Sequence, residues 1–387
     1  MSAASQLESR LRDRLAQLRA DNLTRVMRPP AGVDLSSNDY LQLSMHPAVT
    51  AAFAAGLAAE GAGSTGSRLL RGERTAFSAL EQRFAAFKGA ERSLFFSSGY
   101  LANLAVLTTL PETGDVIFSD SLNHASLIDA ARLSRAGRVV FPHNDVEALG
   151  RLLEQTPCAG LRFVVVESLF SMDGDVAPLA AYARLCRERQ AVLVVDEAHA
   201  VGIFGATGGG LVEELGVGSD VTVTVNTAGK ALGVGGAFVA GPGWLIEYLV
   251  QRARPFVFST AAPPAMAWAL GASLDVVRDE PVRRARLRSL AAHLRGRLRE
   301  AGLDVAPGDS HIVPVQIGPN DVALAVADAL QAEGFDVRAI RPPTVPDGTS
   351  RLRVSINTSL DEAVLDRFAR LALAALKEAG LCSAAFS

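Results

Sequence analysis

The chain has 387 residues, of which 49% are hydrophobic and 20% are charged, with a formal net charge of −3. This length and balance are typical of a globular protein of two or three domains, and the slight negative charge argues against a nucleic-acid partner. Apolar stretches of about six to eight residues are too short to span a membrane, which takes about 20.

The N-terminus is expected to form an amphipathic helix from Ser5 to Arg19. Short β-branched runs then alternate with helical patterns between about residues 90 and 240. The expected strands are 161–166, 191–195, 221–225 and 236–240, and 178–190 has the spacing of a helix. This alternation indicates an α/β fold in which helices flank a mainly parallel central sheet.

The segment after Pro263-Pro264 has a different pattern. Long helices are expected from about 266 to 301, and strands near 312–317 and 351–356 indicate a smaller α+β domain. We therefore predict three parts: an N-terminal helical segment (1–45), a large domain (46–265) and a C-terminal α+β domain (266–387).

The cysteines and lysines are few. Cys158, Cys186 and Cys382 are far apart and lack metal-ligand spacing, so we expect reduced thiols, no bound metal and a cytoplasmic location. Only three of the 38 basic residues are lysines. An amine can lose its proton and attack a carbonyl, whereas a guanidinium effectively cannot.

Lys230 is the candidate reactive amine, because it lies in the apolar, glycine-rich segment Thr-Ala-Gly-Lys-Ala-Leu-Gly. A loop lysine that extends into solvent is the simpler alternative. Lys88 and Lys377 lie in polar helical contexts and are expected at the solvated surface.

Polar residues follow two of the expected strands. Asp196 and His199 come directly after 191–195, and Thr227 follows 221–225. A buried carboxylate needs a cation, and a protonated pyridine ring is one that an aspartate keeps protonated as an electron sink. His199 could reach the phenolic oxygen of that ring, and Thr227 a phosphate. With Lys230, these residues predict a pyridoxal-phosphate site.

Two upstream segments fit the same cofactor. The run Phe95 to Tyr100 precedes a helix expected near Leu101, and amides at a helix N-terminus bind phosphate. His124, in Asn-His-Ala-Ser, could stack on a flat ring, although a histidine after a strand is more often structural.

Two other interpretations compete. Asp196 to His199 spells the DEAH box of helicases, but that reading needs an upstream phosphate loop ending in Gly-Lys-Ser/Thr. The only Gly-Lys pair, Gly229-Lys230, lies downstream. The glycine-rich run 205–210 lacks dinucleotide-loop spacing and is read as a flexible turn.

The ordered motifs resemble the α-oxoamine synthases, pyridoxal-phosphate enzymes of fold type I. The likeness covers nearly the whole chain, in segments 36–41, 66–69, 96–100, 124–126, 170–174, 196–199, 229–233 and 254–260. The resemblance implies that Lys230 holds the cofactor as a Schiff base and then removes the substrate Cα proton.

The same resemblance assigns the other contacts. Asp196 is implied to pair with the ring nitrogen, His199 and Ser171 to bond the phenolate region, and His124 to stack on the ring as part of the catalytic set. Phosphate contacts are implied for Gly99, Tyr100, Thr227 and, from a partner subunit, Thr260. Substrate contacts are implied for Arg353, which would clamp the amino-acid carboxylate, for His124, and for Arg25, Asn38 and Thr344 on the acyl-donor side.

Within the family, segment 339–353 is most similar to members that condense L-alanine with a pimeloyl thioester in biotin synthesis. The acyl carrier is left open between CoA and a carrier protein, and a homodimer is implied. Phe77, Ala200 and the run 356–360 depart from the family pattern. The alternatives are a sibling that joins glycine or serine to another acyl thioester, and a non-catalytic binding protein.

Overall fold

The structure is a computed structural model that describes residues 2–303, 305 and 308–381. It contains two compact units. The large unit comprises residues 38–171 and 175–286, and the small unit comprises residues 1–37, 172–174 and 287–387. The three-part division at residues 45 and 265 stays a prediction.

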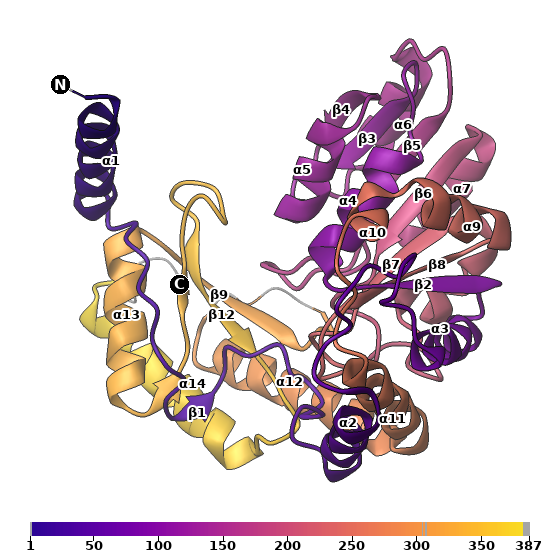
Figure 1. The fold of residues 1–387 in the computed structure, drawn as a ribbon. Coiled ribbons are helices and arrows are strands. Elements are labelled where there is room, and N and C mark those ends of the chain that lie inside the picture. The colour runs from indigo at the N-terminus through magenta and orange to yellow at the C-terminus, as the bar shows by residue number, and fades with distance from the viewer. Residues whose placement is uncertain (1, 304, 306–307, 382–387) are drawn as a thin grey trace. The chain divides into compact units, whose positions relative to one another are not determined.

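The large unit is built on a seven-stranded sheet (Figure 1). Its order is β2 (Arg92–Phe96), β8 (Ala237–Gly241), β7 (Val223–Thr227), β6 (Ala191–Asp196), β5 (Arg162–Glu167), β3 (Val116–Asp120) and β4 (Gly137–Phe141). The strands from β7 to β4 are parallel, and β8 runs antiparallel to both of its neighbours. The predicted mainly parallel sheet is therefore confirmed.

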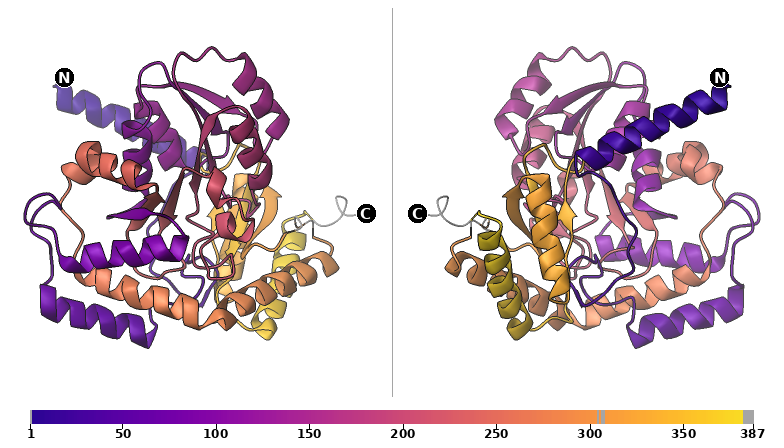
Figure 2. Two further views of the ribbon diagram at one scale, coloured as in Figure 1. Left: turned by 90° about the vertical axis from the view of Figure 1, so that its right-hand side faces the viewer. Right: turned by 90° about the vertical axis from the view of Figure 1, so that its left-hand side faces the viewer.

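Helices cover both faces of this sheet (Figure 2). One face packs against α4 (Gly99–Thr109), α5 (Ala125–Leu133), α9 (Gly243–Arg252) and α10 (Arg254–Val257). The other carries α3 (Thr75–Lys88), α6 (Val146–Gln155) and α7 (Leu179–Glu188). There Phe84 of α3 stacks on Phe238 of β8 with ring centroids 3.8 Å apart. Because both faces are covered, β5 and β6 are apolar runs rather than alternating ones.

The remaining elements of the large unit are α2 (Pro47–Glu60), α8 (Leu211–Glu214), a short 3-10 helix (Gly218–Asp220) and α11 (Ala265–Asp279). Helix α12 (Pro281–Glu300) follows α11 after a break at Glu280. A proline disfavours helical backbone at the residue before it, so the predicted helical stretch 266–301 forms two helices.

The strand order changes direction between β3 and β5. The chain passes from β3 to β4 at the edge of the sheet, then returns to place β5 on the other side of β3. In open α/β sheets, ligands bind beyond the carboxyl ends of the strands at such a switch point.

The small unit has an antiparallel sheet of order β11 (Ala339–Ile340), β12 (Ser350–Ser355) and β9 (Ile312–Gly318), with α13 (Asn320–Ala332) and α14 (Glu362–Glu378). A parallel pair joins β1 (Val33–Asp34) to β10 (Phe335–Asp336). His293 and Arg297 of α12 bond to Asp366 of α14 at 2.8 and 2.9 Å. The predicted C-terminal α+β architecture is confirmed.

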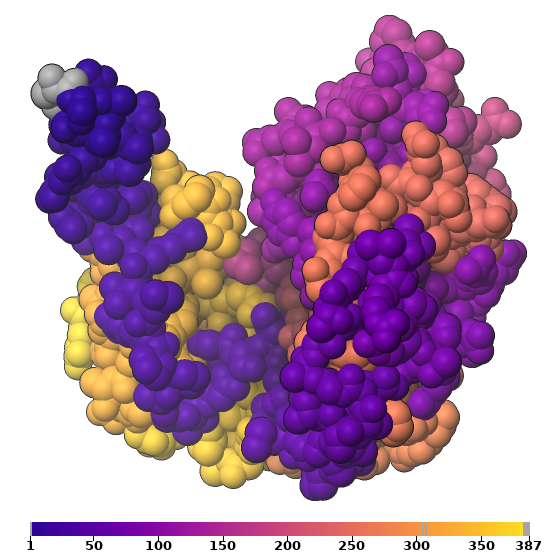
Figure 3. Space-filling model, viewed as in Figure 1, coloured from indigo at the N-terminus to yellow at the C-terminus, as the bar shows by residue number. Residues whose placement is uncertain are grey.

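Helix α1 (Ala3–Ala20) confirms the predicted N-terminal helix. None of its residues is buried, and Figure 3 shows the face of this helix that is turned to the viewer. Within the described part of the chain, no helix has both the length and the apolar character needed to cross a bilayer.

The surface prediction for Lys88 is wrong. Its side chain is only 3% exposed, and its ammonium donates to the fully buried carboxylate of Glu197 and to the carbonyl of Gly209. The loop leading into α8 covers the end of α3, and Glu197 also accepts from the Val212 N–H at 2.9 Å. Lys377 is exposed on α14, as predicted.

The cysteine prediction can be followed at two of three positions. Cys158, half-buried, and Cys186, buried, are free thiols. Cys382 lies outside the described residues.

Candidate active site

Four polar residues end neighbouring strands at one edge of the large-unit sheet. Asp120, Glu167, Asp196 and Thr227 are the last residues of β3, β5, β6 and β7. The carboxyl ends of parallel strands meet at the same edge, which here includes the switch point. The structure therefore gathers three carboxylates and a hydroxyl where a ligand is expected.

Lys230 and His199 meet at this edge. Lys230 follows β7 in a turn, and its ammonium nitrogen lies 2.7 Å from Nε2 of His199. The other ring nitrogen of His199 lies 2.8 Å from the hydroxyl of Tyr40, which donates to Oδ1 of Asn38 at 2.8 Å. The imidazole is thus held at both nitrogens, which fixes the direction in which its ring faces.

Asp196 is buried at the end of β6. Its carboxylate accepts from Nδ2 of Asn103 at 2.7 Å and from the Ala198 N–H at 2.8 Å. Both donors are neutral, so they orient the carboxylate without balancing its charge. A protonated ring nitrogen supplies the cation that a buried carboxylate needs, and the donor set fits pyridoxal phosphate.

The N-terminus of α4, where a phosphate contact was predicted, lies beside the end of β7. Ser98 caps this helix by accepting from the Leu101 N–H at 3.3 Å. A Cβ on Gly99 would collide with Oγ1 of Thr227, so only glycine lets the strand end and the helix start approach this closely. Gly99 at the first turn of α4 therefore lies directly beside the Thr227 hydroxyl, and a helix N-terminus is where phosphate binds.

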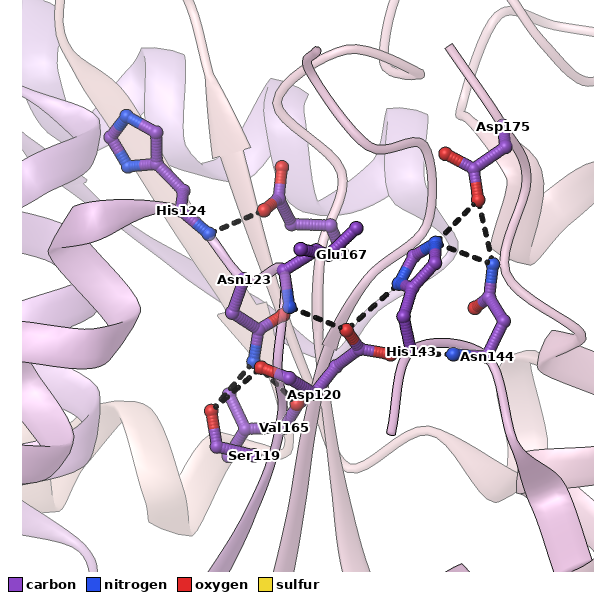
Figure 4. Close-up of polar contacts among 10 residues, drawn as sticks. Ser119, Asp120, Asn123, His124, His143, Asn144, Val165, Glu167 and Asp175 are labelled. Carbon is purple, nitrogen blue, oxygen red and sulfur yellow. Dashed lines mark hydrogen bonds and ion pairs between the residues drawn. The ribbon is translucent and has the colours of Figure 1, made fainter. Parts of the chain in front are cut away.

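His124 caps α5 on the same side of the sheet. Its backbone N–H donates to Oε1 of Glu167 at 2.5 Å (Figure 4). Nδ1 of its ring lies 2.8 Å from Oγ of Ser126. Desolvation lowers the pKa of His124, Asp196 opposes this, and Lys230 adds to it. A neutral imidazole is thereby favoured, which suits stacking on a flat ring.

For the other predicted residues, the structure gives their exposure or local bonds. Ser171 is half-buried in the loop after β5, and Thr260 is exposed in the loop after α10. Arg353, Arg25 and Thr344 belong to the small unit, where Arg353 donates to Oγ of Ser355 at 2.7 Å. Arg25 donates to Oγ1 of Thr344 at 3.3 Å, so these two acyl-side residues do meet. Their substrate contacts stay predictions.

Three residues of this edge were not among the predicted ones. Asn103, Tyr40 and Glu167 contact Asp196, His199 and His124, respectively. Asn103 and Tyr40 come from elements distant in sequence. Glu167 ends an apolar strand just as Asp196 does, so its place at this edge could have been predicted from the sequence.

A charged network lies beside the site (Figure 4). Nδ1 of His143 is 2.9 Å from Asp120, and Nε2 is 2.7 Å from Asp175. Asn144 donates to both carboxylates at 2.9 and 2.7 Å. Burial by itself would lower the pKa of His143, but bonds and charges from Asp120 and Asp175 outweigh it and raise the pKa to about 10. A charged imidazole thus joins the loop after β5 to the strand ends.

This network predicts a pH-dependent stability. The folded protein binds the His143 proton more tightly than the unfolded chain, whose histidines titrate near about 6.5. The stabilisation is therefore complete below about pH 6.5 and lost as pH rises through about 10. Urea unfolding between pH 6 and 10 should show wild type losing its advantage over His143→Gln across that range. Asp175→Asn should move the loss to lower pH. An advantage that is constant with pH would contradict this account.

Comparisons with known proteins agree with the site chemistry. The family model for aminotransferase class I and II matches residues 30–371. An 8-amino-7-oxononanoate synthase from Anaeromyxobacter dehalogenans (strain 2CP-1) is 52% identical over 336 residues, which cover 87% of this chain and 84% of that protein.

Two solved structures extend the comparison. A serine palmitoyltransferase variant from S. paucimobilis with a bound PLP–myriocin aldimine superposes with a TM-score of 0.91 at 30% identity, covering 98% of this chain and all of that one. An 8-amino-7-oxononanoate synthase from Francisella tularensis gives a TM-score of 0.78 at 28% identity, covering 90% of this chain and 98% of that one.

Proposed function

Because this chain belongs to the α-oxoamine synthases, a branch of the pyridoxal-phosphate enzymes of aminotransferase class I and II, we propose that it catalyses the 8-amino-7-oxononanoate synthase reaction. In that reaction L-alanine and a pimeloyl thioester condense with loss of carbon dioxide and thiol, a step of biotin synthesis. The observation that carries the proposal is the grouping of Lys230, His199 and Asp196 beyond the carboxyl ends of β6 and β7, in a chain 52% identical to such a synthase.

The residues at the strand ends have complementary tasks. Bound pyridoxal phosphate supplies an electron sink for the pair left at the substrate α-carbon. Asp196, oriented by Asn103 and Ala198, holds the proton on the ring nitrogen. Lys230 anchors the cofactor and, as a free amine, takes the proton from the substrate α-carbon. That amine lies 2.7 Å from Nε2 of His199, the residue that would bond the phenolic oxygen of the bound cofactor.

Phosphate and ring contacts complete the cofactor site. The Gly99 and Tyr100 amides and the Thr227 hydroxyl would bind the phosphate. His124 would cover one face of the ring, and Ser171 would bond the phenolate side. Thr260 is exposed, and it would contact the phosphate bound by the partner subunit of a homodimer. Light scattering of the holoenzyme tests whether the dimer forms.

Substrate selection is proposed for four further residues. Arg353 would bind the carboxylate of alanine through its planar fork of donors. Arg25 and Thr344, which bond to each other, and Asn38 would contact the acyl donor. The carrier of the pimeloyl group, CoA or an acyl carrier protein, can be decided by offering each in turn.

The amino-acid assignment has a spectroscopic test. The purified protein should be yellow, and L-alanine should perturb its visible spectrum at lower concentrations than glycine or serine do. Adding pimeloyl thioester should then release thiol only when alanine is present. A response selective for glycine or serine would overturn the assignment.

One alternative rests on a specific observation. The serine palmitoyltransferase structure superposes with a higher TM-score, 0.91, than the Francisella tularensis synthase, 0.78. This comparison favours serine and a long-chain acyl thioester. The 52% identity to the Anaeromyxobacter synthase against 30% to the transferase supports alanine instead.

A further inference from the structure

Glu167 stands between two other carboxylates at the edge where the cofactor would bind. Strand β5 lies between β6 and β3, and the three strands end in Glu167, Asp196 and Asp120. Glu167 and Asp196 are register partners, so their side chains point to the same face of the sheet. Both are buried, with 3% and 5% exposure.

The carboxylates on either side of Glu167 each have more partners that stabilise a negative charge. Asp120 contacts the imidazole of His143 at 2.9 Å and accepts the N–H groups of Leu122 and Asn144. Asp196 accepts from two N–H donors and faces the position expected for a cationic ring. Among the residues that the structure describes, Glu167 accepts one hydrogen bond, from the His124 backbone N–H.

Buried carboxylates at the ends of adjacent strands oppose one another's charge, and the carboxyl with the fewest stabilising partners is the one expected to take up a proton. We propose that Glu167 is a positioning residue for the reaction: it holds the backbone of His124 and, by carrying a proton, leaves Asp196 as the charge that meets the cofactor ring. The role of Glu167 toward the cofactor rests on the proposed function, whereas its protonation does not.

The surrounding charges agree with this protonation. Burial first, and the charges of Asp196 and Asp120, raise the pKa of Glu167. Lys230 and the His124 N–H act in the opposite direction and do not cancel the shift, which brings the pKa to about 8. A neutral Glu167 is therefore expected at pH 7.

Its second task is to fix His124. The 2.5 Å bond holds the first residue of the α5 cap in place, and Ser126 holds the ring at 2.8 Å. An acceptor oxygen at position 167 is needed for this task, whereas a negative charge is not. Glutamine meets that need and cannot ionise; methionine has similar length and no acceptor.

The first experiment uses cofactor-free protein and no substrate. Between about pH 4.5, where an unfolded glutamate titrates, and about pH 8 the folded wild type should hold one more proton than the unfolded chain. As pH rises through this range, the free energy of unfolding of wild type in urea should therefore fall relative to that of Glu167→Gln. The difference in slope should correspond to one proton. Equal slopes for the two proteins would contradict the proposal that Glu167 carries a proton.

The second experiment uses the holoenzyme. Glu167→Gln should keep kcat and the cofactor dissociation constant within about threefold of wild type and lose any activity limb near pH 8. Glu167→Met should weaken cofactor binding at least tenfold, because His124 loses its acceptor. A folded Glu167→Gln as impaired as Glu167→Met would overturn the proposal.

A third measurement covers the case in which Glu167→Gln does not fold. Infrared spectra of cofactor-free wild type should show a protonated carboxyl C=O band at pH 6.5 that is gone by pH 9.5. Its absence at pH 6.5 would contradict the proton whatever substrates the enzyme uses. Failure of the alanine and pimeloyl assays alone would leave these unfolding and infrared results unchanged.

Discussion

Replacing Lys230 with alanine is expected to reduce kcat by a factor of about 10³ or more, because proton transfer by a positioned base contributes about 10²–10⁴ by itself. The variant also loses the amine that anchors the cofactor, so the purified protein should lose its yellow colour. The amine's contact with His199 at 2.7 Å places it inside the proposed cofactor site. Steady-state assays with alanine and pimeloyl thioester measure the effect.

The small number of lysines offers a matched control. Lys377 is exposed on α14, and Lys377→Ala should keep full activity and colour. Borohydride reduction followed by peptide mapping should place the cofactor on the peptide that contains Lys230. Label on another peptide, or a yellow and active Lys230→Ala, would refute the assignment.

Lys88→Met should lower the free energy of unfolding by about 3–5 kcal/mol, the usual cost of removing one partner of a buried ion pair. The substitution leaves the carboxylate of Glu197, which is fully buried, without its cation. It also leaves the carbonyl of Gly209 without that donor. Domains are typically stable by only about 5–15 kcal/mol, so the loss should be evident in urea unfolding of the cofactor-free protein.

Two further variants isolate the cause. Lys377→Met changes an exposed lysine and should alter stability by no more than about 0.5 kcal/mol. Adding Glu197→Gln to Lys88→Met should recover much of the loss, because glutamine removes the unpaired charge while its oxygen can still accept from Val212. If Lys88→Met were no more harmful than Lys377→Met, the buried pair would not matter for stability.

The fold could be predicted where local pattern and burial agree. Strands β5 and β6 are largely continuous apolar runs because helices cover both faces of their sheet. Lys88 could not be placed this way. It sits at the polar end of a helix beside Gly89, and its burial comes from a loop more than one hundred residues later in the chain.

The candidate site divides along the same line. Asp196, His199 and Lys230 carry a sequence signal because polar residues follow apolar strands at the edge where ligands bind. Asn103 and Tyr40 carry no such strand-end signal, since they reach the site from an α-helix and an N-terminal loop through tertiary contacts. Glu167 also ends an apolar strand, so the same pattern could have identified it as a residue of this edge.

Mass spectrometry of the products formed from L-alanine labelled with ¹³C in its carboxyl group and a pimeloyl thioester tests the central claim most directly. The account predicts 8-amino-7-oxononanoate without label, together with one labelled carbon dioxide and one free thiol per turnover. A product that retains the carboxyl label, or condensation that occurs only with glycine or serine, would contradict it.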